Sequence, residues 1–296
     1  MTLLRSATRV NNPMIPAATR RNAALPPKTA RIGPITPQFC TPMPRLDFRT
    51  PRLFVDRPLQ ANTVLDLDRN QANYLSNVLR LGAGDRVLVF NGRDGEWAAR
   101  LGAGKRPALE LAEPMRPQRQ AEDIRYAFAP LKHARLDYVV QKAVEMGAST
   151  LLPVMTQHTQ VSRMNLERMR ANVIEAAEQC GILNIAVVAA PVPFNVFLKD
   201  REASRLLVFC DEDAEEADPI AALKSAPAHR GIDVLIGPEG GFAEAERQAL
   251  LATPAVVRLS LGPRILRADT AGVAALALVE AAFGTSLRHN GPKHCG

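Results

Sequence analysis

The chain has 296 residues, of which 47% are hydrophobic, and its formal net charge is +7. This length predicts two domains with enough apolar material for folded cores. No apolar run reaches the roughly 18 residues that a membrane-spanning helix requires. The four cysteines are far apart and the five histidines are scattered, so no zinc-ligand spacing occurs. We therefore expect no metal ion and no membrane segment, and we expect the cysteines to be free thiols in a reducing compartment.

Residues 1–42 differ in composition from the rest of the chain. They contain six basic residues and no acidic ones, so the remaining residues have a net charge of only +1. Their Pro, Ala, Thr and Arg content and the lack of a hydrophobic period predict a disordered extension. A start codon assigned too far upstream is one explanation, and an organellar transit peptide is the other. We expect a cytoplasmic protein, or an organellar one if the extension is a genuine transit peptide.

Residues 43–113 contain short runs bounded by turn residues, which is typical of strands. One helix interrupts them, with Asp68 as its N-cap and an apolar stripe from Ala72 to Leu79. The sequence therefore predicts a small β-barrel with one helix, followed by a proline-punctuated linker at residues 114–121. The expected strands are residues 52–56, 63–67, 86–91, 96–101 and 108–113.

From residue 122 onward, strand and helix patterns alternate, which predicts an α/β domain with a parallel sheet covered on both faces. This domain is expected to end near residue 290, leaving residues 291–296 as a tail. The expected strands are residues 124–130, 150–155, 185–189, 206–210, 233–236 and 256–261. The expected helices are residues 134–146, 165–180, 244–252 and 269–283. The last of these is apolar on nearly every side, so it must be buried in a core or at a subunit interface.

Two of the predicted strands end abruptly in glycine, within residues 234–242 and 259–271. Glycine allows backbone N–H and C=O groups to approach a ligand closely. The carboxyl ends of parallel strands share one edge of a sheet, where cofactors bind. We expect the two ends to lie side by side and to form a cofactor site.

These paired motifs resemble those of the SPOUT superfamily, and within it the bacterial 16S ribosomal RNA uridine-N3 methyltransferases. Residues 74–80, 141–147 and 175–181 also resemble motifs of that family, so the resemblance covers about residues 43–290. It implies a PUA-like RNA-binding barrel in front of a knotted methyltransferase domain, with both glycine loops in a trefoil knot. It also implies S-adenosylmethionine as methyl donor, small-subunit ribosomal RNA as substrate, and a homodimer.

The resemblance further implies which residues hold the donor, mostly through backbone groups of the two loops. Glu239 could instead cap the helix that begins near Glu244. The implied donor-binding residues are Leu235, Ile236, Gly237, Glu239, Gly240, Gly241, Leu259, Leu261, Gly262 and Leu266.

Uracil N3 is a poor nucleophile while it is protonated, so the site must remove its proton or stabilise the resulting anion. Arg264 and Arg267 flank the second loop and could supply positive charge, and Asp269 could accept the proton or orient an arginine. Alternatively, Arg267 and Asp269 pair across the start of a helix, where aspartate is favoured.

Arg80 matches a family motif in the first domain and is a candidate phosphate contact, together with Arg57, Arg86 and Arg93. Lys142 is a further candidate on the substrate side. It shares a helix face with Glu145, so a solvated ion pair is the alternative. By contrast, the acidic residues 211–216 are expected to form a solvated loop.

Three positions depart from the family pattern, which commonly has histidine at Asn73, arginine at Ile182 and glutamate at Asp269. The expected function is methyl transfer from S-adenosylmethionine to N3 of a uridine in small-subunit ribosomal RNA. The alternatives are another SPOUT enzyme, acting on a transfer RNA base or a ribose, and an RNA-binding relative without activity. The sequence contains no G-x-x-x-x-G-K-S/T motif, which argues against a phosphate-binding NTPase.

Overall fold

The computed structural model describes residues 47, 49–103, 107–161, 163–211, 213–214 and 218–287. All of them belong to one unit, residues 46–296. The predicted extension at residues 1–42 and the tail at 291–296 lie outside the described residues, as do Cys40 and Cys295. None of the helices in the described part is both long and apolar enough to cross a membrane.

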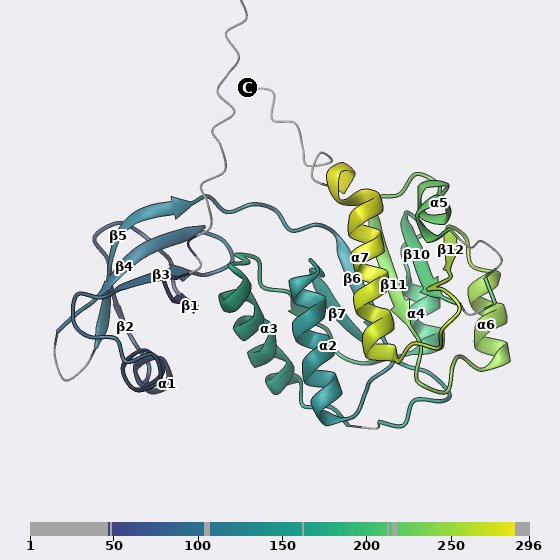
Figure 1. Ribbon diagram of the computed structural model, residues 1–296, viewed down its shortest axis with the longest axis horizontal. Helices are drawn as coiled ribbons and strands as arrows, with labels where there is room; N and C mark the ends of the chain where they lie inside the picture. Colours follow the sequence, from purple (N-terminus) through teal and green to yellow (C-terminus); the bar gives the residue numbers. More distant parts are fainter. Residues whose placement is uncertain are drawn as a thin grey trace, which may run out of the picture. The chain divides into compact units, whose positions relative to one another are not determined.

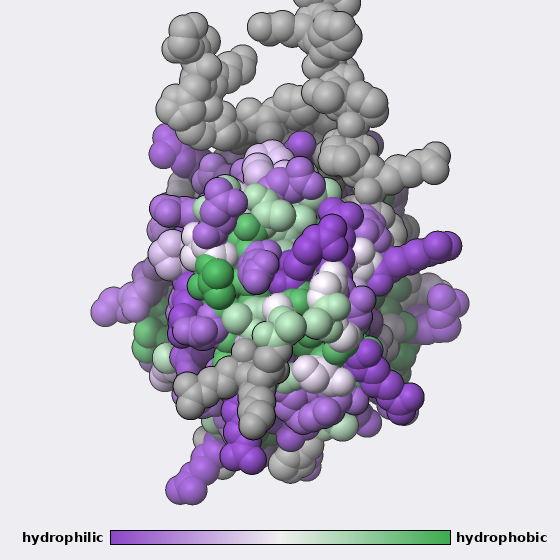
Figure 2. Space-filling view, turned by 90° about the vertical axis from the view of Figure 1, so that its left-hand side faces the viewer, coloured by the Kyte–Doolittle hydropathy of each residue, from purple (hydrophilic) through white to green (hydrophobic). Residues whose placement is uncertain are grey.

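The N-terminal part contains the five expected strands in one sheet, ordered β1-β3-β4-β5-β2 (Figure 1). The strands are β1 (Arg52–Phe54), β2 (Val64–Asp66), β3 (Arg86–Phe90), β4 (Glu96–Leu101) and β5 (Ala108–Arg116). One side of the sheet buries an apolar cluster that includes Leu53, Val87 and Leu109. On the face shown in Figure 2, hydrophobic residues gather in the middle and hydrophilic residues surround them, and Val64 and Val78 are each 60% exposed.

Strand β5 continues to Arg116, three residues past the expected end. Its register with β4 shifts between Glu96 and Ala99, which marks a β-bulge or irregularity. A bulge tolerates Pro114, which has no N–H to donate to the ladder. Residues 114–116 are therefore strand, and the part of the chain predicted as linker at 114–121 begins only after Arg116.

Helix α1 (Arg69–Asn73) begins at the predicted cap, where the Asp68 side chain accepts from the N–H groups of Asn70 and Gln71. The helix continues as a π-helical turn, η1 (Tyr74–Val78). After it, Arg80 has a φ of 57°, a left-handed conformation that is uncommon for a residue with a side chain. After the π-helical turn and this left-handed residue, the chain enters the turn that leads into β3. Arg80 is exposed directly before that turn.

The C-terminal sheet is entirely parallel, and its main path runs β12-β10-β11-β6-β7-β8, with β9 paired to β7. This confirms the predicted α/β architecture. The strands are β6 (Ile124–Phe128), β7 (Thr150–Met155), β8 (Val187–Val188), β9 (Val192–Pro193), β10 (Arg205–Cys210), β11 (Gly231–Ile236) and β12 (Val256–Leu259).

Helices cover both faces of this sheet (Figure 1). One face packs against α2 (His133–Glu145), α3 (Leu166–Cys180), α5 (Pro219–Lys224) and α7 (Ala268–Leu287). The other packs against α4 (Phe194–Asp200) and α6 (Glu244–Leu251). Helices α4 and α5 were not predicted, because six or seven residues are too few to show a helical period. Helix α7 contributes Ala275, Leu276 and Val279 to the core, as its apolar composition predicted.

Candidate active site

Three parallel strands end together at one edge of the C-terminal sheet. Strand β10 pairs with β11 on one side and with β12 on the other. The expectation that the ends of β11 and β12 lie side by side is therefore wrong, because β10 separates them. At about 4.8 Å per strand spacing, the two glycine loops start roughly 10 Å apart. The candidate site at this edge consequently includes three loops, and the loop after β10 lies between the two glycine loops.

The loop after β11 exposes its backbone. Gly237 is packed beneath the Phe242 ring, and a Cβ there would lie only 2.9 Å from the ring carbon Cε2. Gly241 has a φ of +73°, and its N–H donates to the Pro238 carbonyl at 2.9 Å, which closes a turn with Glu239 and Gly240 exposed at its tip. Glycine is required at Gly241 by its backbone angle and at Gly237 by the close aromatic ring.

The loop after β12 has a similar character. Gly262 has a φ of +92° and an added Cβ would meet no atom within 4 Å, so its backbone faces open space. Leu261 and Leu266 are half-buried against the core. Arg264 and Arg267, the predicted anion-stabilising residues, are both exposed.

The side chains of Leu235, Ile236 and Leu259 are buried in the sheet core. Only their backbone groups, at the strand ends, are placed to face a ligand. Apolar half-buried leucines beside exposed glycine backbone suit a nucleoside, whose base needs apolar contact and whose edges need hydrogen bonds. The residues present therefore fit a nucleoside-containing cofactor.

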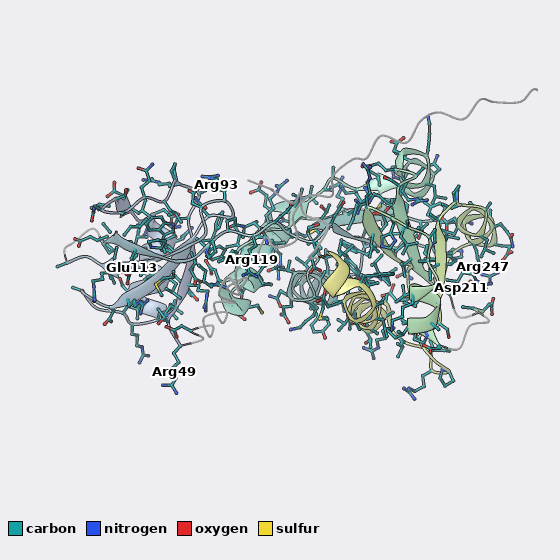
Figure 3. The ribbon with its side chains drawn as sticks, turned by 90° about the horizontal axis from the view of Figure 1, so that it is seen from above. Arg49, Arg93, Glu113, Arg119, Asp211 and Arg247 are labelled. Atoms are coloured by element: carbon teal, nitrogen blue, oxygen red, sulfur yellow. The ribbon has the colours of Figure 1, made fainter. Side chains whose placement is uncertain are left out.

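Asp211, directly after β10, is buried, whereas the sequence predicted that it lies in a solvated acidic loop. Its exposed fraction is only 3%. Arg258 of β12 contacts its Oδ2 at 2.8 Å through Nε, and Arg247 of α6 contacts the same oxygen at 3.2 Å through Nη2 (Figure 3). Burial alone would raise the pKa of Asp211, but the hydrogen bonds from both arginines outweigh it and lower the pKa below its usual range. The carboxylate ties α6 and β12 to the end of β10.

Two elements outside the motifs contact the loop after β11. Arg135 of α2 lies 3.3 Å from Glu239, measured from Nη1 to Oε1, and both side chains are nearly half exposed. The ring Nδ1 of His158, in the loop after β7, lies 3.1 Å from the Gly241 carbonyl oxygen. Sequence reasoning missed Arg135 and His158, because neither lies in a motif or at an informative spacing.

The alternative role of Glu239 as a helix cap is wrong. Helix α6 starts after Ala243, and the Ala243 N–H is bound by the side chain of Glu246 at 3.1 Å. Glu239 instead lies at the loop surface, where it pairs with Arg135.

Asp269 lies in the first turn of α7, where its charge interacts favourably with the helix dipole. Its carboxylate accepts from the Thr270 N–H at 2.8 Å. Within the described residues no ion pair joins it to Arg267, so the predicted alternative of a direct pair is not observed. Asp269 lines a narrow crevice between α2 and α7 with Tyr126 and Lys142. Burial raises the pKa of Tyr126, and the nearby Asp269 charge adds to this.

The structure pairs Lys142 with Glu145, with Nζ 2.7 Å from Oε1. This hydrogen bond raises the pKa of Lys142. The predicted ion pair is thus present, and Lys142 lies beside Asp269 rather than beside the glycine loops.

The four candidate arginines of the N-terminal part are all exposed but form two groups. Arg80 and Arg86 lie at the start of β3, on either side of the Gly82–Asp85 turn. Arg57 and Arg93 lie at the other end of β3, where Asn91 Nδ2 donates to the Arg57 carbonyl at 2.9 Å. The structure does not bring all four together into one patch.

Comparison with known proteins adds to this geometry. A family model described as an RNA methyltransferase domain matches residues 118–280. A second model, described as an RNA methyltransferase PUA domain, matches residues 67–111. The first match covers the parallel sheet with its three loops, and the second covers α1, β3, β4 and the first part of β5.

Individual relatives agree with the family models. The ribosomal RNA small subunit methyltransferase E of Synechocystis sp. is 32% identical over 234 residues, covering 78% of this chain and 77% of that protein. The protein of the same name from Rickettsia conorii is 29% identical over 231 residues, covering 77% of this chain and 94% of that one. A crystal structure of the Neisseria gonorrhoeae enzyme of this name, bound to S-adenosyl methionine, aligns with a TM-score of 0.70 at 26% identity, covering 78% of this chain and 97% of that one.

Proposed function

This chain belongs to the ribosomal RNA small subunit methyltransferase E family of RNA methyltransferases, and we propose that it methylates N3 of a uridine in small-subunit ribosomal RNA. The observation that carries the proposal is the edge where β10, β11 and β12 end, with open glycine backbone at Gly241 and Gly262. The rivals remain a transfer RNA or ribose methyltransferase and an inactive RNA-binding relative. They are distinguished by the reaction product.

We propose S-adenosylmethionine as the methyl donor. When bound, this cofactor supplies an electrophilic methyl group on a sulfonium. Leu261 and Leu266 would contact its adenine, while the backbone of the two glycine loops would bond its polar edges. The relative from Neisseria gonorrhoeae binds the same compound.

The chain's own residues would prepare the nucleophile. N3 must lose its proton before it can attack a methyl group, and this loss places negative charge on the uracil that the later N–C bond would neutralise. Arg264 and Arg267 are exposed beside the second loop, so their side chains are free to approach that charge. Asp269, two residues after Arg267, would accept the proton or orient an arginine.

We assign residues 43–116, which end with strand β5, to a PUA-like RNA-binding barrel, 117–121 to a linker and 122–290 to a methyltransferase domain whose glycine loops form a trefoil knot. The family models at 67–111 and 118–280 support this division. Arg57, Arg80, Arg86, Arg93 and Lys142 are the proposed RNA contacts. We also propose a homodimer in which α7 lies near the subunit interface, because its outward residues are small and apolar.

The test is nucleoside mass spectrometry of ribosomal RNA after incubation with the purified protein and labelled S-adenosylmethionine. The RNA is taken from cells that lack the gene, so that the target position is unmodified. We expect labelled 3-methyluridine. A different methylated nucleoside would support the transfer RNA or ribose rival, and donor binding without any product would support the inactive relative.

The roles of the arginines are tested separately. Arg267→Ala should abolish most of the product while calorimetry shows unchanged donor affinity. Arg230→Ala, at an exposed position directly before β11 and at the opposite end of that strand from the loops, serves as the matched control. Full activity of Arg267→Ala would remove this residue from the site.

A further inference from the structure

A groove of about 640 Å³ opens on the surface of the C-terminal α/β domain. It lies between the start of α2, the start of α3 and the loop that follows β7. Its buried floor is apolar, formed by Leu131, Leu136 and Met169, which are at most 9% exposed. The volume is within the range of sites that hold small organic ligands.

Two residues close in sequence to the groove's lining residues contact the loop after β11. Arg135, next to the floor residue Leu136, lies 3.3 Å from Glu239. His158, two residues before the lining residue Gln160, contacts the Gly241 carbonyl at 3.1 Å. In the sheet, β6 and β7 follow β11 directly, so the ends of all three strands share one edge. A polymer whose target base enters the donor site would therefore pass this groove.

The rim of the groove is cationic. Its charged lining residues are Lys132, Arg163, Arg168 and Asp137. The Asp137 carboxylate is bound by Arg168 at 2.6 and 2.9 Å and by Asn172 at 2.8 Å. Lys132 and Arg163 are exposed and form no ion pair recorded within the described residues. These two cations are therefore available to an anionic ligand.

Building on the proposed function, we propose that this groove binds an unpaired nucleotide next to the target uridine. Its base would lie on the floor of Leu131, Leu136 and Met169, and its phosphates would contact Lys132 and Arg163. Proteins bind unstacked bases against aromatic or apolar side chains and guanidinium planes, while cations contact the phosphates. A base on this floor would hold the adjacent uridine at the donor loops, so the groove contributes to the choice of target.

Direct contact is tested by photocrosslinking. p-Benzoylphenylalanine replaces Gln160, which lines the groove and is exposed, in the full-length protein. The matched control places it at Arg170, an exposed α3 residue that does not line the groove and lies near Glu167. With unmethylated small-subunit ribosomal RNA, we expect a crosslink from position 160, mapped within a few nucleotides of the methylated uridine, and none from 170. A crosslink from 160 to a second copy of the chain, or none to RNA, overturns the proposal.

The phosphate contacts are tested with Lys132→Gln combined with Arg163→Gln. We expect the KM for RNA to rise about tenfold, with kcat and donor affinity unchanged within about twofold. The slope of log affinity against log salt should fall by about one for each cation removed. An unchanged salt slope would contradict the assignment, and Arg170→Gln should behave as wild type. Absence of methylation by the wild-type protein would instead contradict the proposed function, while the crosslink would still report on the groove.

Discussion

The side chain of Glu178 in α3 accepts a hydrogen bond of 2.8 Å from the backbone N–H of Phe54 in β1. It therefore joins the N-terminal sheet to the helical layer of the C-terminal sheet. Arg116 supports the same junction, since its Nη2 donates to the Gly181 carbonyl at 2.9 Å. Glu178 belongs to one of the motifs that carry the family resemblance, and in this structure that motif makes a structural contact.

This junction predicts a pH-dependent stability. Burial raises the pKa of Glu178 to about 7, and the neighbouring Glu175 contributes to the increase. The folded state therefore favours the protonated carboxyl, so its stabilising contribution is full below pH 4.5 and is lost as the pH rises toward 7. Wild-type protein should lose up to about 3 kcal/mol of unfolding free energy across this interval.

Glu178→Gln should remove most of this pH dependence, because an amide oxygen still accepts the Phe54 N–H but does not ionise. Denaturant unfolding at a series of pH values measures the effect. Glu175→Gln, at an exposed neighbouring position, is the matched control and should keep most of the slope. Equal slopes in wild type and Glu178→Gln would show that another group is responsible.

A second prediction concerns the buried ion pairs at the opposite end of the C-terminal sheet. Asp233 of β11 is fully buried between two arginines, with Oδ2 2.7 Å from Arg125 Nη2 and Oδ1 2.7 Å from Arg205 Nε. Removing one partner of a buried ion pair leaves charge uncompensated and costs about 3–5 kcal/mol. Asp233→Asn should show this loss in chemical unfolding. Asp200→Asn, on the surface, should change stability by less than about 0.5 kcal/mol.

The strands other than the two-residue β9, the alternation of elements and the two glycine loops were predictable, because each depends on a local pattern. The position of β10 between β11 and β12 was not, because strand order depends on long-range pairing that no local pattern encodes. The burial of Asp211 followed from the same cause. Its partner Arg258 lies on β12, which becomes its neighbour only through that strand order.

The contacts of Arg135 and His158 with the loop after β11 were also beyond local reasoning, since they join residues 104 and 83 positions apart. For the candidate RNA-binding arginines of the N-terminal part, local reasoning succeeded on one property and failed on another. Their exposure was predictable from residue type, but their division between the two ends of β3 required the sheet register.

A third prediction tests the glycine of the second loop. Gly262 and Gly147 have φ values of +92° and +87°, and an added Cβ would meet nothing within 4 Å at either position. Alanine should therefore cost a similar amount of stability at both, about 1–2 kcal/mol from backbone strain. Only Gly262→Ala should also weaken S-adenosylmethionine binding, measured by calorimetry, because Gly147 follows α2 outside the loops. Equal donor affinity in the two variants would exclude close backbone approach at Gly262.

The packing of α7 against the sheet supports a fourth prediction. A Cβ on Gly272 would overlap the hydroxyl of Tyr126, which is buried beneath the helix. By helix propensity alone, Gly272→Ala would stabilise α7 by up to about 1 kcal/mol. Overpacking costs about 1–3 kcal/mol, so a net loss of stability is expected. Chemical unfolding would show it, and Gly284 is not a suitable control because a Cβ there would overlap Glu280.

Combining Gly272→Ala with Tyr126→Phe should recover part of the loss, because the hydroxyl is removed and the nearest remaining ring atom lies 3.0 Å from the added Cβ. Since that distance is still tight, recovery should be incomplete. A double-mutant cycle measures the coupling, which should be at least about 0.5 kcal/mol for residues in direct contact. Strictly additive losses would mean that α7 shifts away from β6 to accommodate the methyl group. In that case Asp269, one turn earlier on the same helix, would move with it. The rate of methyl transfer would then fall even under conditions in which the variant remains fully folded.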